Sequence, residues 1–132
     1  MEPEHCRFSS STDAVICARK AVTAYARACG FPESDVFDIA LATGEICTNA
    51  VEHAHSDKGA FSVDCRYEEA VLTVAVRDGG GRDRALPVKD HVGGLGLFLV
   101  RSLTDHVSFQ PTPSGTTVSF SKRRSVNAAL AQ

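Results

Sequence analysis

The 132-residue chain has no long hydrophobic run and no excess of basic residues. No apolar stretch approaches the roughly 20 residues that a membrane-spanning helix needs, so we expect no membrane anchor. The first residues, Met1 to His5, lack the basic and apolar segments of a secretory signal, which favours a cytoplasmic protein. With a formal net charge of −2, the chain has no electrostatic footprint for nucleic-acid binding.

The chain also lacks a Cys-x-x-Cys motif. An odd number of cysteines at spacings unlike a zinc site predicts reduced thiols. We interpret the only basic run, Lys122-Arg123-Arg124, as solvated, and residues 125–132 as a frayed tail. The length suits one compact domain spanning residues 1–132. The five cysteines are Cys6, Cys17, Cys29, Cys47 and Cys65.

Two helices are predicted in the first half of the chain. Side-chain oxygens in residues 9–13 can cap a helix over 14–29, and Gly30 can end it. A second cap opens a helix over 33–53, in which apolar residues recur at helical spacing.

Alternating apolar and polar residues predict strands further along. Residues 61–67 and 71–77 alternate around a turn at Glu68-Glu69, which indicates an antiparallel hairpin. The other predicted elements are a weaker strand over 5–9, a loop over 79–92, a helix over 94–103, and a closing hairpin of 107–109 with 116–120. This order favours an α+β fold, a two-layer sandwich with helices on one face of a mostly antiparallel sheet.

Glu45 and Asn49 lie four residues apart on the second predicted helix, so they share one face, together with His53. A carboxylate in mid-helix between Leu41 and Ile46 is costly to bury unless it meets water, a metal or a donor. Mg²⁺ prefers hard oxygen ligands, so the Asn49 amide oxygen would suit it beside substrate phosphates. A solvated helix edge is the alternative interpretation of this stripe.

Asp78 continues the buried alternation of Leu72, Val74 and Val76. The three glycines that follow it, residues 79–81, allow another molecule to approach the backbone closely. A carboxylate here can accept a hydrogen bond from the adenine amine but would repel a guanine carbonyl, which favours ATP over GTP. An aspartate that caps its own turn is the alternative.

The run Gly93-Gly94-Leu95-Gly96 precedes an apolar helix, and backbone amides at such a position attract phosphate oxygens. It is not a P-loop, and Leu99 breaks a Rossmann fingerprint. A simple turn is the alternative. His53 and His55 lack a third metal ligand at useful spacing, and no Gly-x-Ser-x-Gly elbow of a hydrolase occurs.

In order and spacing, these segments resemble the boxes of the GHKL ATPase superfamily, which has the Bergerat fold. Residues 45–54 are similar to its N box, 78–80 to its first glycine box, 93–97 to its second, and Gly115-Thr116 to its terminal glycine-threonine element. The resemblance covers residues 35–120 and is greatest to the bacterial anti-sigma-factor serine/threonine kinases.

The resemblance implies phosphoryl transfer from ATP with Mg²⁺ as cofactor. Glu45 would be the general base, Asn49 the magnesium ligand and Asp78 the adenine contact. The other nucleotide-binding residues that it implies are Gly80, Gly93, Gly94, Leu95, Gly96, Leu97 and Thr116.

The resemblance also implies partners. Such a kinase is an anti-sigma factor that binds a sigma factor and phosphorylates an anti-anti-sigma antagonist, and it works as a homodimer. Two alternatives remain open. Arg82 replaces the last glycine of the first glycine box, which motivates the alternative of a catalytically inactive ATP-binding anti-sigma or signalling subunit. A kinase of a multiprotein stress complex would share the site but differ in its partners.

Overall fold

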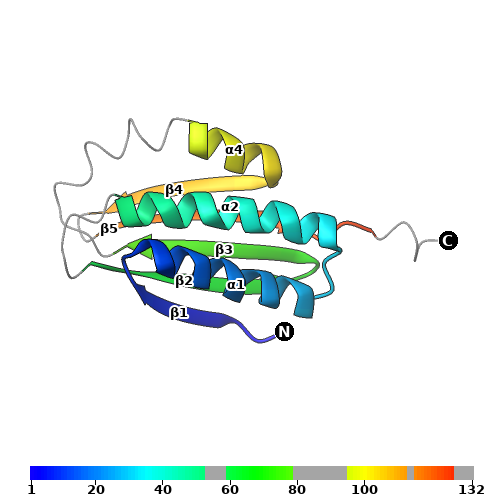
Figure 1. Cartoon of the computed structure of the whole chain (residues 1–132). Helices are drawn as coiled ribbons and strands as arrows, with labels where there is room; N and C mark the ends of the chain where they lie inside the picture. The colour runs from blue at the N-terminus through cyan, green and yellow to red at the C-terminus, as the bar shows by residue number, and fades with distance from the viewer. Residues whose placement is uncertain (53–58, 79–94, 113–114, 127–132) are drawn as a thin grey trace.

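In the computed structural model, helices cover one face of a five-stranded sheet (Figure 1). The structure describes residues 1–52, 59–78, 95–112 and 115–126. Within these ranges the elements follow the order β1-α1-α2-β2-β3-α4-β4-β5, and the strands lie in the order β1-β2-β3-β5-β4. Each described strand pair is antiparallel. The predicted α+β two-layer sandwich is confirmed.

The helices α1 (Thr12–Ala28) and α2 (Glu33–Glu52) confirm the first two predicted helices. α1 begins after Ser11, whose Oγ accepts a hydrogen bond of 3.1 Å from a first-turn amide. It ends before Gly30, whose φ of +88° stops the helix. No helix in the described ranges is both long and apolar enough to cross a membrane.

The strands β2 (Ala60–Glu68) and β3 (Val71–Asp78) form the predicted antiparallel hairpin. The turn lies at Glu69-Ala70, one residue later than predicted. Both turn residues have positive φ, 52° and 69°, which is the left-handed geometry that a two-residue hairpin turn requires. The turn contains none of the usual Asn or Gly residues, so the sequence carries no signal for its position.

The remaining elements complete the sheet and the helical layer. They are β1 (Glu4–Ser9), α4 (Leu95–Leu103), β4 (His106–Thr112) and β5 (Gly115–Arg123). β1 and β4 are the edge strands. The predicted first strand, glycine-framed helix and closing hairpin are therefore confirmed, whereas the predicted loop over 79–92 lies outside the described residues.

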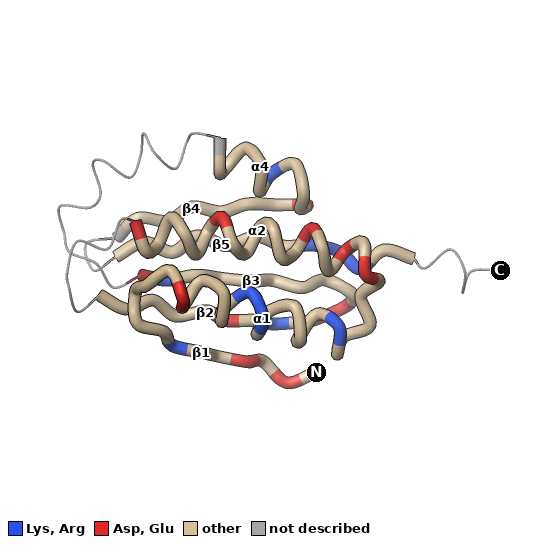
Figure 2. The backbone as a smooth tube through the Cα atoms, in the orientation of Figure 1, with Lys and Arg blue, Asp and Glu red and all other residues tan. Residues whose placement is uncertain are grey.

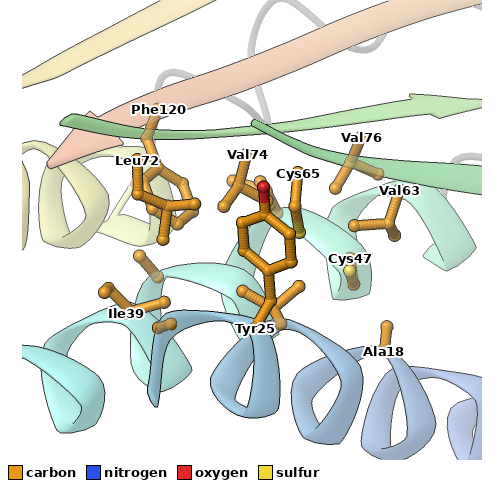
Figure 3. Close-up of a cluster of buried hydrophobic side chains, with 14 of the residues drawn as sticks. Ala18, Tyr25, Ile39, Cys47, Val63, Cys65, Leu72, Val74, Val76 and Phe120 are labelled. Atoms are coloured by element: carbon orange, nitrogen blue, oxygen red, sulfur yellow. The ribbon is translucent and has the colours of Figure 1, made fainter. Parts of the chain in front are cut away.

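The hydrophobic core lies between the sheet and the helices (Figure 3). The central strand β3 sends Leu72, Val74 and Val76 into this core, where each is almost completely buried. Asp78 follows in the same alternation, so the packing of β3 fixes its carboxylate at the end of the core. The side chains labelled in Figure 3 are Ala18, Tyr25, Ile39, Cys47, Val63, Cys65, Leu72, Val74, Val76 and Phe120.

Lys122 and Ser125 connect the end of β5 to the helical layer. The predictions that Lys122 is solvated and that the tail frays from residue 125 were therefore wrong for these two residues. Lys122 Nζ donates to Leu103 O at 3.0 Å. Ser125 N and Oγ each donate to the buried carboxylate of Asp35 at 2.7 Å. The two partners lie 19 and 90 residues away in sequence, so local composition could not reveal them. Residues 127–132 lie outside the described residues.

Candidate functional site

Glu45 and Asn49 occupy consecutive turns of α2 and lie against the first turn of α4. A Cβ added to Gly96 would lie 2.8 Å from Glu45 Oε1 and 4.0 Å from Asn49 Nδ2. The structure thus brings together three residues that the sequence placed in two separate motifs. Glu45 and Asn49 therefore face the start of α4.

Asn49 carries an unsatisfied polar atom at this point. Its Nδ2 is buried and has no hydrogen-bond partner among the described residues. Buried amides are nearly always paired, because an unpaired one costs about 1–3 kcal/mol. This unpaired N–H donor would be satisfied by an additional acceptor, such as an oxygen of water or of a phosphate.

The side chain of Asn49 could ligate a magnesium ion that is bound together with a phosphate group. The amide of Asn49 offers a neutral oxygen, and Mg²⁺ prefers such hard ligands while keeping several others from water or phosphate. The described residues contain no cluster of three or more His, Cys, Asp or Glu that could hold a metal.

Asp78 lies between two neighbouring strands. In the antiparallel register it stands opposite Phe61 of β2 and Thr116 of β5. Asp78 and Thr116 are each 5% exposed. The predicted inward orientation of Asp78 is confirmed, and the row places an aromatic ring, a carboxylate and a hydroxyl at one end of the core.

The group of Glu45, Asn49 and Gly96 and the pair of Asp78 and Thr116 lie toward the same end of the sandwich. Figure 1 shows the later turns of α2, the end of β3 and the start of β5 together there, with α4 beginning beside α2. Leu95 is the first residue of α4, and Leu97 packs into the core and anchors the helix. Gly80, Gly93 and Gly94, together with His53 and His55, lie outside the described residues.

Two cysteine thiols in the core, Cys47 and Cys65, are buried and have a raised pKa. Cys47 lies on α2 between Glu45 and Asn49 but points into the core, and burial raises its pKa to about 12. Burial likewise raises the pKa of Cys65 to about 12. All five cysteines are free thiols, and these two are unsuited to nucleophilic chemistry at neutral pH.

A groove between α1 and α2 was not predicted. It has a volume of about 500 Å³, and Phe37 beside it is 64% exposed. Figure 2 shows basic residues in the middle and at the end of α1, and only acidic charges along α2. The sequence signal was Ile16 and Phe37, which are apolar but fall outside the buried faces of their helices. The lining residues are Ile16, Arg19, Lys20, Thr23, Arg27, Glu33, Val36, Phe37 and Ala40.

Comparison with known families defines the class of protein. Residues 8–122 match the family model described as the histidine kinase-like ATPase domain. The chain therefore belongs to this family, which confirms the superfamily inferred from the sequence motifs.

Individual relatives narrow the class to protein kinases. A serine-protein kinase RsbW from Bacillus velezensis is 35% identical over 120 residues, covering 79% of this chain and 74% of the relative. The RsbW of Halalkalibacterium halodurans is 30% identical over 118 residues, covering 79% and 72%. The chain is a member of the RsbW family of serine-protein kinases, as the resemblance implied.

A solved structure confirms the fold. The crystal structure of the RsbU and RsbW domains of Rv1364c from Mycobacterium tuberculosis superposes with a TM-score of 0.78 at 23% identity. The match covers 97% of this chain but 34% of that longer one. At this identity, the likeness shows a shared architecture.

Proposed function

We propose that this protein is an ATP-dependent serine/threonine kinase and anti-sigma factor that binds a sigma factor and phosphorylates an anti-anti-sigma antagonist. The observation that carries the proposal is the meeting of Glu45 and Asn49 with Gly96, within a chain of the RsbW family. A sigma-factor partner would place the protein in the cytoplasm.

The nucleotide would lie between the two groups of polar residues. Asp78 would accept a hydrogen bond from the adenine amine, and the neighbouring Thr116 hydroxyl would contact the same base. The predicted phosphate contacts are the backbone at Gly93, Gly94, Leu95, Gly96 and Leu97, with Gly80 beside the base. Asn49 Oδ1 would hold Mg²⁺, which neutralises charge on the phosphates when bound.

Glu45 would act on the acceptor hydroxyl. The hydroxyl oxygen of a serine or threonine forms a bond to the γ-phosphorus, the bond from that phosphorus to the bridging oxygen of ADP breaks, and the hydroxyl proton passes to the Glu45 carboxylate. Catalysis would come mainly from aligning the reactants and stabilising charge, because the protein forms no covalent bond with the transferred phosphoryl group.

The groove between α1 and α2 supports the protein-binding part of the proposal. It combines exposed Ile16 and Phe37 with Arg19 and Lys20, a mixture of apolar and charged groups suited to a protein partner. A homodimer belongs to the proposal on family resemblance alone. Light scattering at micromolar concentration tests it, since a monomeric mass would contradict a dimer.

The test of the proposed function is transfer of label from [γ-³²P]ATP to a protein in an extract of the source organism. Wild-type protein should label a second protein on serine or threonine. Glu45→Gln should bind ATP as before. It should transfer phosphate at least about 100-fold more slowly, because the general base is lost. Glu68→Gln, which changes an exposed carboxylate at the end of β2, is the control and should transfer normally.

The outcomes separate the kinase from its alternatives. Undiminished transfer by Glu45→Gln would remove Glu45 from its assigned role. ATP binding without transfer by the wild-type protein would favour an ATP-sensing binding subunit. Capture of a partner other than a sigma factor by an active enzyme would favour the kinase of a stress complex.

A further inference from the structure

We propose that Gly96 is a positioning residue for the reaction, and that its missing side chain leaves the space in which the Glu45 carboxylate lies. The inference rests on the proposed function of Glu45 as the base. It assigns Gly96 a role toward a protein side chain, in addition to the phosphate contact that the motif suggests.

The contact is too close for any other residue. The Cβ position at Gly96 lies 2.8 Å from Glu45 Oε1 and 3.9 Å from Glu45 Cδ, and side-chain carbons do not tolerate the first of these distances. The atom that must yield is the end of a flexible side chain rather than backbone. An alanine at this position would therefore displace the carboxylate and leave the helices in place.

Backbone conformation does not explain the glycine. Gly96 is the second residue of α4, and among the described glycines only Gly30 and Gly115 have positive φ. An alanine could adopt the same backbone, and in a helix alanine is more favourable than glycine. What glycine provides at this position is room beside Glu45 and Asn49.

A structural role and a positioning role predict opposite results for Gly96→Ala. If the glycine served folding, the variant would melt at a lower temperature. If it serves Glu45, the variant should melt at the same or a higher temperature while transfer falls at least 10-fold, because small misplacements of reacting groups are costly.

The experiment compares wild type, Gly96→Ala, Glu45→Asp and the double variant. Gly44→Ala is the matched control, because Gly44 is also helical and its added Cβ would meet the flexible side chain of Arg19, 3.1 Å from Cδ. Each protein is measured for melting temperature, for affinity toward ATP with Mg²⁺ by calorimetry, and for the labelling rate described above. Where Glu45 is present, its carboxyl ¹³C resonance is also recorded by NMR.

We expect Gly96→Ala to shift the Glu45 resonance, keep ATP affinity within about threefold and slow transfer at least 10-fold, whereas Gly44→Ala changes none of the three. In Glu45→Asp the side chain is one methylene shorter, so its carboxylate lies further from α4. Adding Gly96→Ala to this variant should slow transfer by less than a further twofold. Such non-additivity is what a direct contact between the two positions produces.

Two results would overturn the inference. One is a Gly96→Ala variant with an unmoved Glu45 resonance and normal transfer. The other is a loss of ATP affinity that is equally large in the Glu45→Asp background, which would mean that Gly96 serves only the phosphates. If the wild-type protein labels no acceptor, the proposed function fails, and the Glu45 resonance still decides whether Gly96 controls the carboxylate.

Discussion

Asp78 of β3 and Thr116 of β5 stand opposite each other in the antiparallel register, and both are buried. Cross-strand partners point to the same face of a sheet, so the carboxylate and the hydroxyl lie next to each other at the end of the core. This pair forms the proposed adenine end of the nucleotide site. Glu45, Asn49 and Gly96 lie together where α2 meets α4 and would form the proposed phosphate end.

Asp78→Asn should weaken ATP binding at least 10-fold and reduce the preference for ATP over GTP. The substitution keeps the size of the side chain but removes the charge that would accept from the adenine amine and repel a guanine carbonyl. Calorimetry with both nucleotides measures the effect. Asp64→Asn, on the half-exposed Asp64 of β2, is the control. Equal ATP affinity in wild type and Asp78→Asn would place the adenine elsewhere.

Asn49→Ala should reduce the contribution of Mg²⁺ to ATP affinity about 10-fold without lowering the melting temperature. The amide loses its proposed metal contact, but its Nδ2 has no partner within the described residues, so folding loses no hydrogen bond there. The measurement is an ATP titration with Mg²⁺ and with EDTA, alongside a thermal melt. A variant that melts lower and still responds fully to Mg²⁺ would make Asn49 a structural residue.

Ser125→Ala should destabilise the fold by about 1 kcal/mol, equivalent to a fall of about 3–5 °C in Tm. The variant removes the Oγ hydrogen bond to the buried Asp35 carboxylate and leaves the backbone one. Ser102→Ala is the control, because the Ser102 hydroxyl makes an exposed bond to its own helix. If both variants melt alike, the contact at Asp35 contributes nothing to stability.

The buried thiols predict a loss of stability at alkaline pH. Burial raises the pKa of Cys47 and Cys65 from 9.0 to about 12, so above pH 9 the unfolded chain releases protons that the folded chain keeps. The free energy of unfolding should therefore fall as pH rises from about 9 toward 12. Urea denaturation across this range should show a shallower fall in Cys47→Ala, and an equal slope would count against the assignment.

The fold could be predicted from local patterns to a large extent. Helices α1 and α2 follow from capping residues and apolar spacing, and the alternation of β3 placed Asp78 on the buried face. The turn at Glu69-Ala70 was misplaced because two non-glycine residues adopt left-handed backbone there. Neither residue has an intrinsic preference that would have indicated this geometry.

The candidate site was predicted by the spacing of its motifs, but its contacts were not. Nothing in the helical period of α2 reveals that Gly96 of α4 lies against Glu45, because the contact joins segments about fifty residues apart. The prediction that Lys122 is solvated was wrong for the same reason. Its partners, Leu103 O and Asp38, are reached through the tertiary fold.

The most direct test of this account is a calorimetric titration of the wild-type protein with ATP and with GTP, each with and without Mg²⁺. We predict that ATP binds, that Mg²⁺ strengthens its binding, and that GTP binds at least 10-fold more weakly, because the Asp78 carboxylate would accept from the adenine amine and repel a guanine carbonyl. Absence of ATP binding, or equal binding of the two nucleotides, would contradict a kinase site built from Glu45, Asn49 and Asp78.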